Sequence, residues 1–344
     1  LYEYRHMVQF DSLDHGMNTW GRYLFGEEMY MGLIFMSVPT WYYEGDSVLT
    51  ETCLSRGGRG RTPAFDVELR TLLLNGKRHD YYKAMLGSYD DYDPLSSPYL
   101  LGYFMNTHIR TKYGADALVR ANRRTSYLSI VPYRHTFAVK HITGKHTSDV
   151  YEDVMDEMTD LWKNQLQGLA LTEVKTIASG PEDEWSKYLT PRDLGNGRMA
   201  CLHYGMYDMM SIVVMDRATG KTVSEIDAAP SDMMIGGASG RVVWAESVPD
   251  ERWGLVSSND IYMHDVAKDR TVRLTRGGRY HAPSLSPDGK TIVAVEYTGT
   301  NMCSLVIIDA NSGRIISRYS SPDNDFIQTP SWTSDGKGIV YCAI

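Results

Sequence analysis

The 344-residue sequence contains few cysteines and has no long apolar run. None of its four cysteines forms a C-x-x-C pair, which speaks against both a disulfide framework and a structural zinc knot. The longest apolar stretch, Met29 to Pro39, is too short for a membrane span, which takes about 20 residues. The sequence therefore predicts no transmembrane segment, and the cysteine count leaves the redox compartment open.

Basic side chains are in the minority, because 35 lysines and arginines stand against 43 aspartates and glutamates. The net charge of -8 speaks against a nucleic-acid partner, since phosphate binding requires a concentrated basic surface. With 42% hydrophobic and 23% charged residues, the chain has the composition of a folded protein. It begins with Leu1 rather than methionine, and we expect it to be a piece of a longer protein whose targeting segment lies upstream.

The pattern changes near residue 175 from helical to strand-rich. Residues 150–169 carry apolar side chains at steps of three to five, and residues 99–113 form an apolar helical face that ends at Gly114. We therefore predict a multidomain α+β protein with a helical domain over 1–172 and a strand-rich domain over 173–344.

Two turns recur in step through the second half. The first contains a glycine before a short apolar strand, with successive glycines spaced by 43, 49 and 47 residues: Gly197, Gly240, Gly289 and Gly336. The second follows an aspartate that closes an apolar strand: Asp216, Asp265 and Asp309. Aspartate accepts backbone N–H groups in such turns, and glycine adopts positive φ. A period of about 45 residues predicts the four-stranded blades of a β-propeller rather than a Greek-key sandwich, with three blades and the start of a fourth.

These repeats resemble the TolB-like and dipeptidyl-peptidase-like propellers, whose blades carry a P-x-x-S-P-D-G-K turn. Pro283 to Lys290 matches that turn fully, and Pro330 to Lys337 departs from it at Ser334. The resemblance implies a bacterial cell-envelope location, periplasmic or secreted. It also implies that the propeller binds a substrate or a partner.

The first residues, Glu3-Tyr4-Arg5-His6, resemble the latter part of an H-E-x-x-H helix. In that motif two histidines one helical turn apart bind zinc, and the glutamate between them polarises a metal-bound water. Tyr2 stands at the first histidine position, so the motif is degenerate. Alone, a glutamate and a histidine on an amphipathic helix are usually a surface and a core residue.

Two later segments follow in the order found in the gluzincin zinc metallopeptidases, which include aminopeptidase N and leukotriene hydrolase. Residues 41–46 (Trp-Tyr-Tyr-Glu-Gly-Asp) resemble the W-x-x-E-G helix, and residues 99–102 (Tyr-Leu-Leu-Gly) match Y-x-x-G. In the family this glutamate is the third zinc ligand and this tyrosine stabilises the oxyanion. The alternative is that Trp41 and Tyr42 are core aromatics and Glu44 is a surface acid. The 38-residue gap between His6 and Glu44 is long for the family and is expected to contain a helical insertion.

The resemblance implies zinc-dependent, aminopeptidase-like hydrolysis of a peptide or protein substrate. Zinc would be held by His6, Glu44 and a third donor, for which Tyr2 is the candidate; Glu3 would be the general base and Tyr99 the oxyanion donor. The alternative is a catalytically inactive pseudopeptidase whose propeller is a scaffold for a protein or glycan partner. The substitution at position 2 favours this alternative, whereas the joint retention of Glu3, His6, Glu44 and Tyr99 argues against it and favours the zinc peptidase.

Three further segments receive weaker assignments. The basic segment Arg56 to Arg61 is expected to be a solvated loop, with contact to a substrate carboxylate as the alternative. His135, His141 and His146 fit no compact ligand set, and we expect them to be surface residues. The acidic residues 88–93 lack the spacing of a calcium loop.

Overall fold

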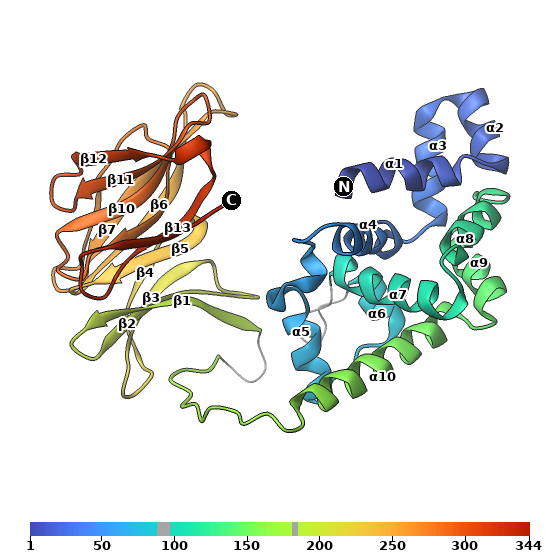
Figure 1. Cartoon of the computed structure of the whole chain (residues 1–344), viewed down its shortest axis with the longest axis horizontal. Helices are drawn as coiled ribbons and strands as arrows, with labels where there is room; N and C mark the ends of the chain where they lie inside the picture. The colour runs from blue at the N-terminus through green and yellow to red at the C-terminus, as the bar shows by residue number, and fades with distance from the viewer. Residues whose placement is uncertain (88–96, 181–184) are drawn as a thin grey trace. The chain divides into compact units, whose positions relative to one another are not determined.

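The computed structural model describes residues 1–87, 97–180 and 185–344, so the acidic residues 88–93 lie outside the described part. The chain divides into two compact units, Leu1–Thr172 and Glu173–Ile344. In Figure 1 the helices of the first unit run from blue to green, and the strands of the second run from green-yellow to red. Within the described residues, every helix is too short or too polar to cross a membrane.

The described secondary structure of the first unit is helical. Its elements are α1 (Tyr2–Leu13), α2 (Gly16–Phe25), α3 (Glu27–Ser37), α4 (Thr40–Leu54), the 3-10 helix η1 (Arg59–Arg61), α5 (Pro63–Leu74), α6 (Tyr81–Leu86), α7 (Pro98–Tyr113), α8 (Ala117–Ser126), α9 (Arg134–Thr143) and α10 (Thr147–Leu166). The helical insertion expected between His6 and Glu44 is present as α2 and α3.

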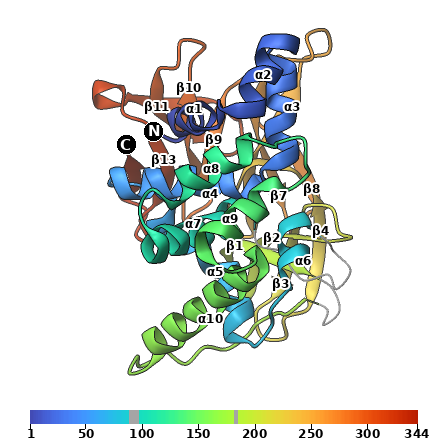
Figure 2. The same cartoon turned by 90° about the vertical axis from the view of Figure 1, so that its right-hand side faces the viewer.

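Local chemistry explains where the predicted helices begin and end. Helix α7 begins after Ser97, whose hydroxyl accepts a hydrogen bond from the backbone N–H of Leu100, and Pro98 occupies the first turn. It ends at Gly114, whose φ is 107°. Helix α10 ends at Leu166, three residues before the predicted end, and packs along α5 and α7 (Figures 1 and 2). Both predicted helices are therefore confirmed.

The second unit consists of consecutive antiparallel sheets. The strands are β1 (Ser186–Gly195), β2 (Arg198–Gly205), β3 (Ser211–Asp216), β4 (Thr222–Asp227), β5 (Pro230–Ala238), β6 (Arg241–Pro249), β7 (Ser257–Asp265), β8 (Arg270–Arg273), β9 (Tyr280–Leu285), β10 (Thr291–Tyr297), β11 (Cys303–Asp309), β12 (Ile315–Ser320), β13 (Ile327–Trp332) and β14 (Ile339–Ala343). A short 3-10 helix, Pro322–Asn324, precedes β13. In sequence order, β1–β4, β5–β8 and β9–β12 form four-stranded sheets, and β13 pairs with β14. Three blades and the start of a fourth are therefore present, as the period predicted.

The repeated turns have the geometry that their residues require. The four turn glycines lie between the first and second strands of each sheet, with φ near +70°. Asp216 ends β3 and accepts hydrogen bonds from the backbone N–H groups of Ala218 and Thr219 at 3.0 and 2.8 Å. Asp309 ends β11 and accepts one from Ser312 at 2.7 Å. Each blade therefore repeats the same two local devices.

The cores of the second unit lie between neighbouring sheets. Alternate residues of the central strands point into different cores, because successive side chains of a strand face opposite sides. In β6, Val242 and Trp244 pack against the first sheet, whereas Val243 packs against the third. Val293 and Val295 of β10 face the two-stranded sheet in the same way. Burial on both faces explains why these strands have continuous apolar runs.

Candidate functional site

Helix α1 presents two of the predicted site residues on one face. Tyr2 and His6 are four residues apart, and their ring centroids lie 5.0 Å from each other. Glu3 is exposed and, within the described residues, has no hydrogen-bond or ion-pair partner. The predicted general base is therefore at the surface of the helix, outside the group that its neighbours form.

The glycines of the two later motifs form the crossing between α4 and α7. A Cβ on Gly45 would lie 2.0 Å from the carbonyl carbon of Gly102, and a Cβ on Gly102 would lie 1.7 Å from the carbonyl oxygen of Trp41. The two helices can approach this closely only because both residues lack a side chain. Glu44 precedes one of these glycines, and Tyr99 lies three residues before the other, so the crossing positions both side chains.

Four of the five predicted residues come together at this crossing. The Tyr2 hydroxyl donates a hydrogen bond to Oε2 of Glu44, and Nε2 of His6 lies 3.8 Å from the same oxygen. The rings of Tyr2 and Tyr99 stack with their centroids 6.3 Å apart. Burial raises the pKa of the Tyr2 phenol well above its usual range, and the Glu44 carboxylate raises it further. Tyr2 is therefore a protonated hydrogen-bond donor in this site.

A buried amide orients His6. Nδ1 of His6 lies 2.9 Å from Oε1 of Gln9, while Nε2 of Gln9 donates to Oδ2 of Asp46 at 3.0 Å and to the backbone carbonyl of Tyr43 at 3.1 Å. Because the Gln9 nitrogen makes both of these donations, its oxygen is left to accept from His6. We therefore assign a proton to Nδ1, and Nε2 is directed toward the Glu44 carboxylate.

Asp46 anchors this amide from a fully buried position. Nε of Arg5 lies 2.6 Å from its Oδ2, and Nη2 of Arg110 lies 2.7 Å from its Oδ1. Two guanidinium groups thus compensate a carboxylate that has no access to water. Gln9 and Asp46 were not assigned from the sequence.

The segment Arg56 to Arg61 packs on α4. A Cβ on Gly58 would lie 2.2 Å from the Cα of Thr52, so glycine is needed for this approach. Nε of Arg59 then binds Oε1 of Glu51 at 2.7 Å. The segment includes the 3-10 helix η1 and is fixed to α4 at Arg59, so the expectation of a solvated loop is wrong for this residue.

Arg59 is a site residue that sequence reasoning did not single out. Its guanidinium carbon lies 4.4 Å from the centroid of the Tyr2 ring and 5.2 Å from that of Tyr99. A cation over two phenol rings is attracted by their π faces. The alternation of glycine and arginine in residues 56–61 was the available signal.

The donor set does not fit a zinc site of the peptidase type. Such a site takes three protein donors and keeps a fourth position for water. His6 and Glu44 supply two metal-binding groups. The Tyr2 hydroxyl, however, donates its proton to the Glu44 carboxylate, and the Arg59 guanidinium lies against the Tyr2 ring. Within the described residues, no group of three or more histidine, cysteine, aspartate or glutamate side chains could hold a metal ion.

His135 corrects another expectation. It is completely buried, and its ring centroid lies 4.7 Å from that of Tyr42. His135 is the second residue of α9 and lies on the face of this helix that packs inward. Burial lowers its pKa to about 3. His141 and His146 are exposed, as expected. Trp41 and Tyr42 are core aromatics, as the alternative assignment of that motif held.

Comparisons with known proteins find similarity in solved structures alone. No protein-family model matches the chain, and no curated protein matches it. TolB from Acinetobacter baumannii is 16% identical over 45% of this chain and 37% of its own, with a TM-score of 0.35. The β-propeller domain of the Trilobed protease from Pyrococcus furiosus is 11% identical over 42% of this chain and 45% of its own, with a TM-score of 0.32.

A third similar structure is the acylaminoacyl peptidase of Pyrococcus horikoshii, which is 11% identical over 46% of this chain and 28% of its own, with a TM-score of 0.34. The chain thus spans less than half of the length of each of these proteins. At such scores the assignment of the blades rests on the strand order and the repeated turns instead.

Proposed function

We propose that the helical unit is a gluzincin-type pseudopeptidase domain, which binds a peptide or protein segment without hydrolysing it. The observation that supports this most directly is the hydrogen bond from the Tyr2 hydroxyl to the Glu44 carboxylate. Tyr2 stands where the resemblance places a zinc-binding histidine, and its proton occupies the oxygen that a metal would need.

The surroundings of this hydrogen bond disfavour a metal in two further ways. Burial keeps the phenol protonated, and a protonated phenol is a poor metal ligand. The guanidinium of Arg59 would also repel a divalent cation placed between Tyr2 and Glu44. The same groups suit hydrogen bonding to a peptide backbone, because the Glu44 carboxylate offers acceptor oxygens and Arg59 offers donors.

The propeller is the second part of the proposal. We propose a TolB-like propeller that binds a protein or glycan partner, in a protein of the bacterial cell envelope. Support comes from the S-P-D-G-K turn at residues 286–290, from its variant at residues 333–337 and from the observed blade order. The location predicts an export signal in the upstream sequence of the natural protein, and an upstream sequence without one would contradict it.

Zinc content of purified protein tests the pseudopeptidase assignment. After dialysis against zinc and then against buffer, we expect the wild type to retain far less than one zinc per chain. Tyr2→His restores the H-E-x-x-H pattern and removes the phenol proton from Glu44, and it should raise the content to near one per chain. Glu44→Ala added to Tyr2→His should abolish that gain. Near-stoichiometric zinc in the wild type, lost in Glu44→Ala, would disprove the assignment.

The second candidate is the zinc-dependent peptide hydrolysis that the resemblance implies. Two observations favour it. Nε2 of His6 lies 3.8 Å from Oε2 of Glu44, and Gln9 accepts from Nδ1 of His6, which leaves Nε2 as the nitrogen that a metal would bind. This function requires Tyr2 to give up its hydrogen bond to Glu44. Hydrolysis of a peptide library by the wild type, inhibited by a chelator and lost in Glu44→Ala, would establish it.

A further inference from the structure

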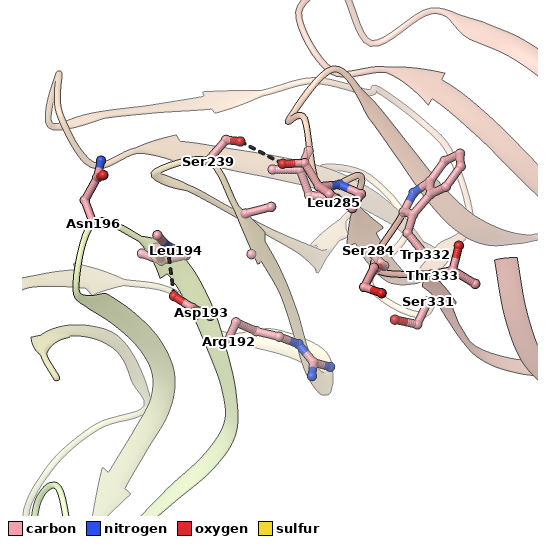
Figure 3. A pocket seen from close by; sticks show the side chains of 15 residues that line it. Arg192, Asp193, Leu194, Asn196, Ser239, Ser284, Leu285, Ser331, Trp332 and Thr333 are labelled. Atoms are coloured by element: carbon pink, nitrogen blue, oxygen red, sulfur yellow. Dashed lines mark hydrogen bonds between the residues drawn. The ribbon is translucent and has the colours of Figure 1, made fainter. Parts of the chain in front are cut away.

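A cavity of about 690 Å³ lies where the first strands of all four sheets end. Its lining comes from the last residues of β1, β5, β9 and β13 and from the turns that follow them. Figure 3 shows these segments converging from sheets that are far apart in the sequence. Because it needs all four sheets, the cavity belongs to the packed sheets together rather than to any one blade.

Arg192 is the charged group that makes this cavity unusual. It is half-buried, and it extends from β1 toward the strands that carry Ser284 and Ser331 (Figure 3). Its Nε donates to the backbone carbonyl of Ile235 at 2.7 Å, which fixes the guanidinium and leaves its two terminal nitrogens to other acceptors.

No acidic side chain of the described residues forms an ion pair with Arg192. The adjacent Asp193 also lines the cavity, but its carboxylate binds Arg217 at 2.9 Å and the backbone N–H of Gly195. Burial lowers the pKa of Arg192, and among the described residues no charged group offsets this effect. Its guanidinium is therefore able to take an anion from outside the described residues as its partner.

The rest of the lining suits a small organic anion. Hydroxyl groups come from three of the sheets, at Ser239, Ser284, Ser331, Thr333 and Ser334. Those of Ser239 and Thr333 donate to the carbonyl of Pro287 and to Asp335, which leaves Ser284, Ser331 and Ser334 for a ligand. Leu194, Leu285 and Trp332 supply apolar surface. Among the described residues that line the cavity, Arg192 is the one basic side chain, which matches a single negative charge better than a phosphate dianion.

The backbone is shaped to hold Arg192 in this position. A Cβ on Gly237 of β5 would lie 2.9 Å from the Cβ of Arg192, so glycine allows the arginine stem to lie against that strand. The first strand of each sheet also contains a bulge, where its pairing with the second strand shifts register and one residue has a positive φ. These residues are Thr190, Met233, Ala282 and Thr329, and they are spaced along the chain as the turn glycines are. These bulges redirect the strand ends that line the cavity.

We propose that this cavity binds a carboxylate group of a peptide, with Arg192 as the residue that receives it. The two free nitrogens of the guanidinium bind the carboxylate oxygens, and the apolar wall contacts the adjoining side chain. The carboxylate is either a chain terminus or an acidic side chain. This site lies in a different unit from Tyr2 and Glu44, so it holds or fails independently of the pseudopeptidase assignment.

Calorimetric titration of the full 344-residue chain tests the proposal. The probes are a short acetylated apolar peptide with a free C-terminal carboxylate, its C-terminal amide, the same amide carrying one glutamate, and inorganic phosphate. The wild type should bind the first or the third probe, which identifies the source of the carboxylate, and should bind the uncharged amide and phosphate at least roughly tenfold more weakly.

Two variants and one matched control complete the experiment. Arg192→Gln should weaken carboxylate binding roughly tenfold or more, whereas Arg270→Gln, an exposed arginine at the start of β8, should leave it unchanged. Ser284→Asp keeps Arg192 but places a competing carboxylate in the cavity, and it should also reduce binding, so the test survives if Arg192→Gln fails to fold. Equal binding by folded Arg192→Gln or Ser284→Asp and by the wild type overturns the proposal. So does phosphate binding as tight as carboxylate binding, or no binding of either carboxylate probe.

Discussion

Glycine has different roles in the two units. In the helical unit Gly45 and Gly102 are required by space, since any side chain would enter the backbone of the opposing helix. In the strand-rich unit the turn glycines Gly197 and Gly240 have no described atom within 4 Å of an added Cβ, and they are required by their positive φ. The lack of space at Gly45 and Gly102 is imposed by a distant part of the chain, whereas the positive φ at Gly197 and Gly240 is a property of the residue's own backbone. Substitutions at the two kinds of position should therefore have effects of different size.

The largest effect is expected at the helix crossing. Gly102→Ala places a methyl group 1.7 Å from the carbonyl oxygen of Trp41, so α4 and α7 must separate. We expect the free energy of unfolding of the helical unit to fall by about 3 kcal/mol, measured by urea denaturation. Gly32→Ala is the matched control, because Gly32 also lies in a helix but no described atom is within 4 Å of its added Cβ. A loss no greater than that of the control would refute the steric role.

A pH dependence is expected from the buried His135. Its folded-state pKa of about 3 lies below the ordinary value of 6.5, so the unfolded chain takes up the proton first as the pH falls. The stabilising contribution is full above pH 6.5 and is lost progressively toward pH 3. Between pH 6.5 and 4.5 the free energy of unfolding should decrease by about 2 kcal/mol.

Denaturant titrations across this pH range measure the decrease. His135→Phe removes the titrating group but keeps an aromatic ring in the core. It should reduce the slope of the unfolding free energy against pH by the equivalent of about one proton. His141→Gln changes an exposed histidine and should leave the slope as it is in the wild type. An unchanged slope in His135→Phe would show that His135 is not the group responsible.

The smallest effect is expected at a blade turn. Gly240→Ala forces a φ of about 71° on a residue with a side chain, which costs about 1 kcal/mol, but it meets no neighbouring atom among those described. Gly254→Ala is the control, because the φ of Gly254 is not in the left-handed region and no described atom lies within 4 Å of its added Cβ. Thermal unfolding should show a small decrease for the first variant and none for the second. A loss as large as that of Gly102→Ala would remove the distinction between the two kinds of glycine.

The two units also differ in how much of their structure could be predicted. The blade hairpins were predicted because an S-P-D-G-K turn specifies its own hydrogen bonds within a few residues, as Ser286 and Asp288 do. In the helical unit the motif residues Tyr2, His6, Glu44 and Tyr99 were predicted to meet from their resemblance to a family. The residues that support them, such as Gln9, were not.

The amino-acid sequence by itself determined the period of the blades, the end of α7 at Gly114 and the identity of the side chains at the helix crossing. Hydrogen bonds and φ preferences over a few residues suffice for these features. The tertiary structure decided that Tyr2 donates to Glu44, that His135 is buried, and that Arg192 has no acidic partner among the described residues. Each of these depends on segments that are tens of residues apart and meet only when helices or blades pack. No local pattern encodes such a contact.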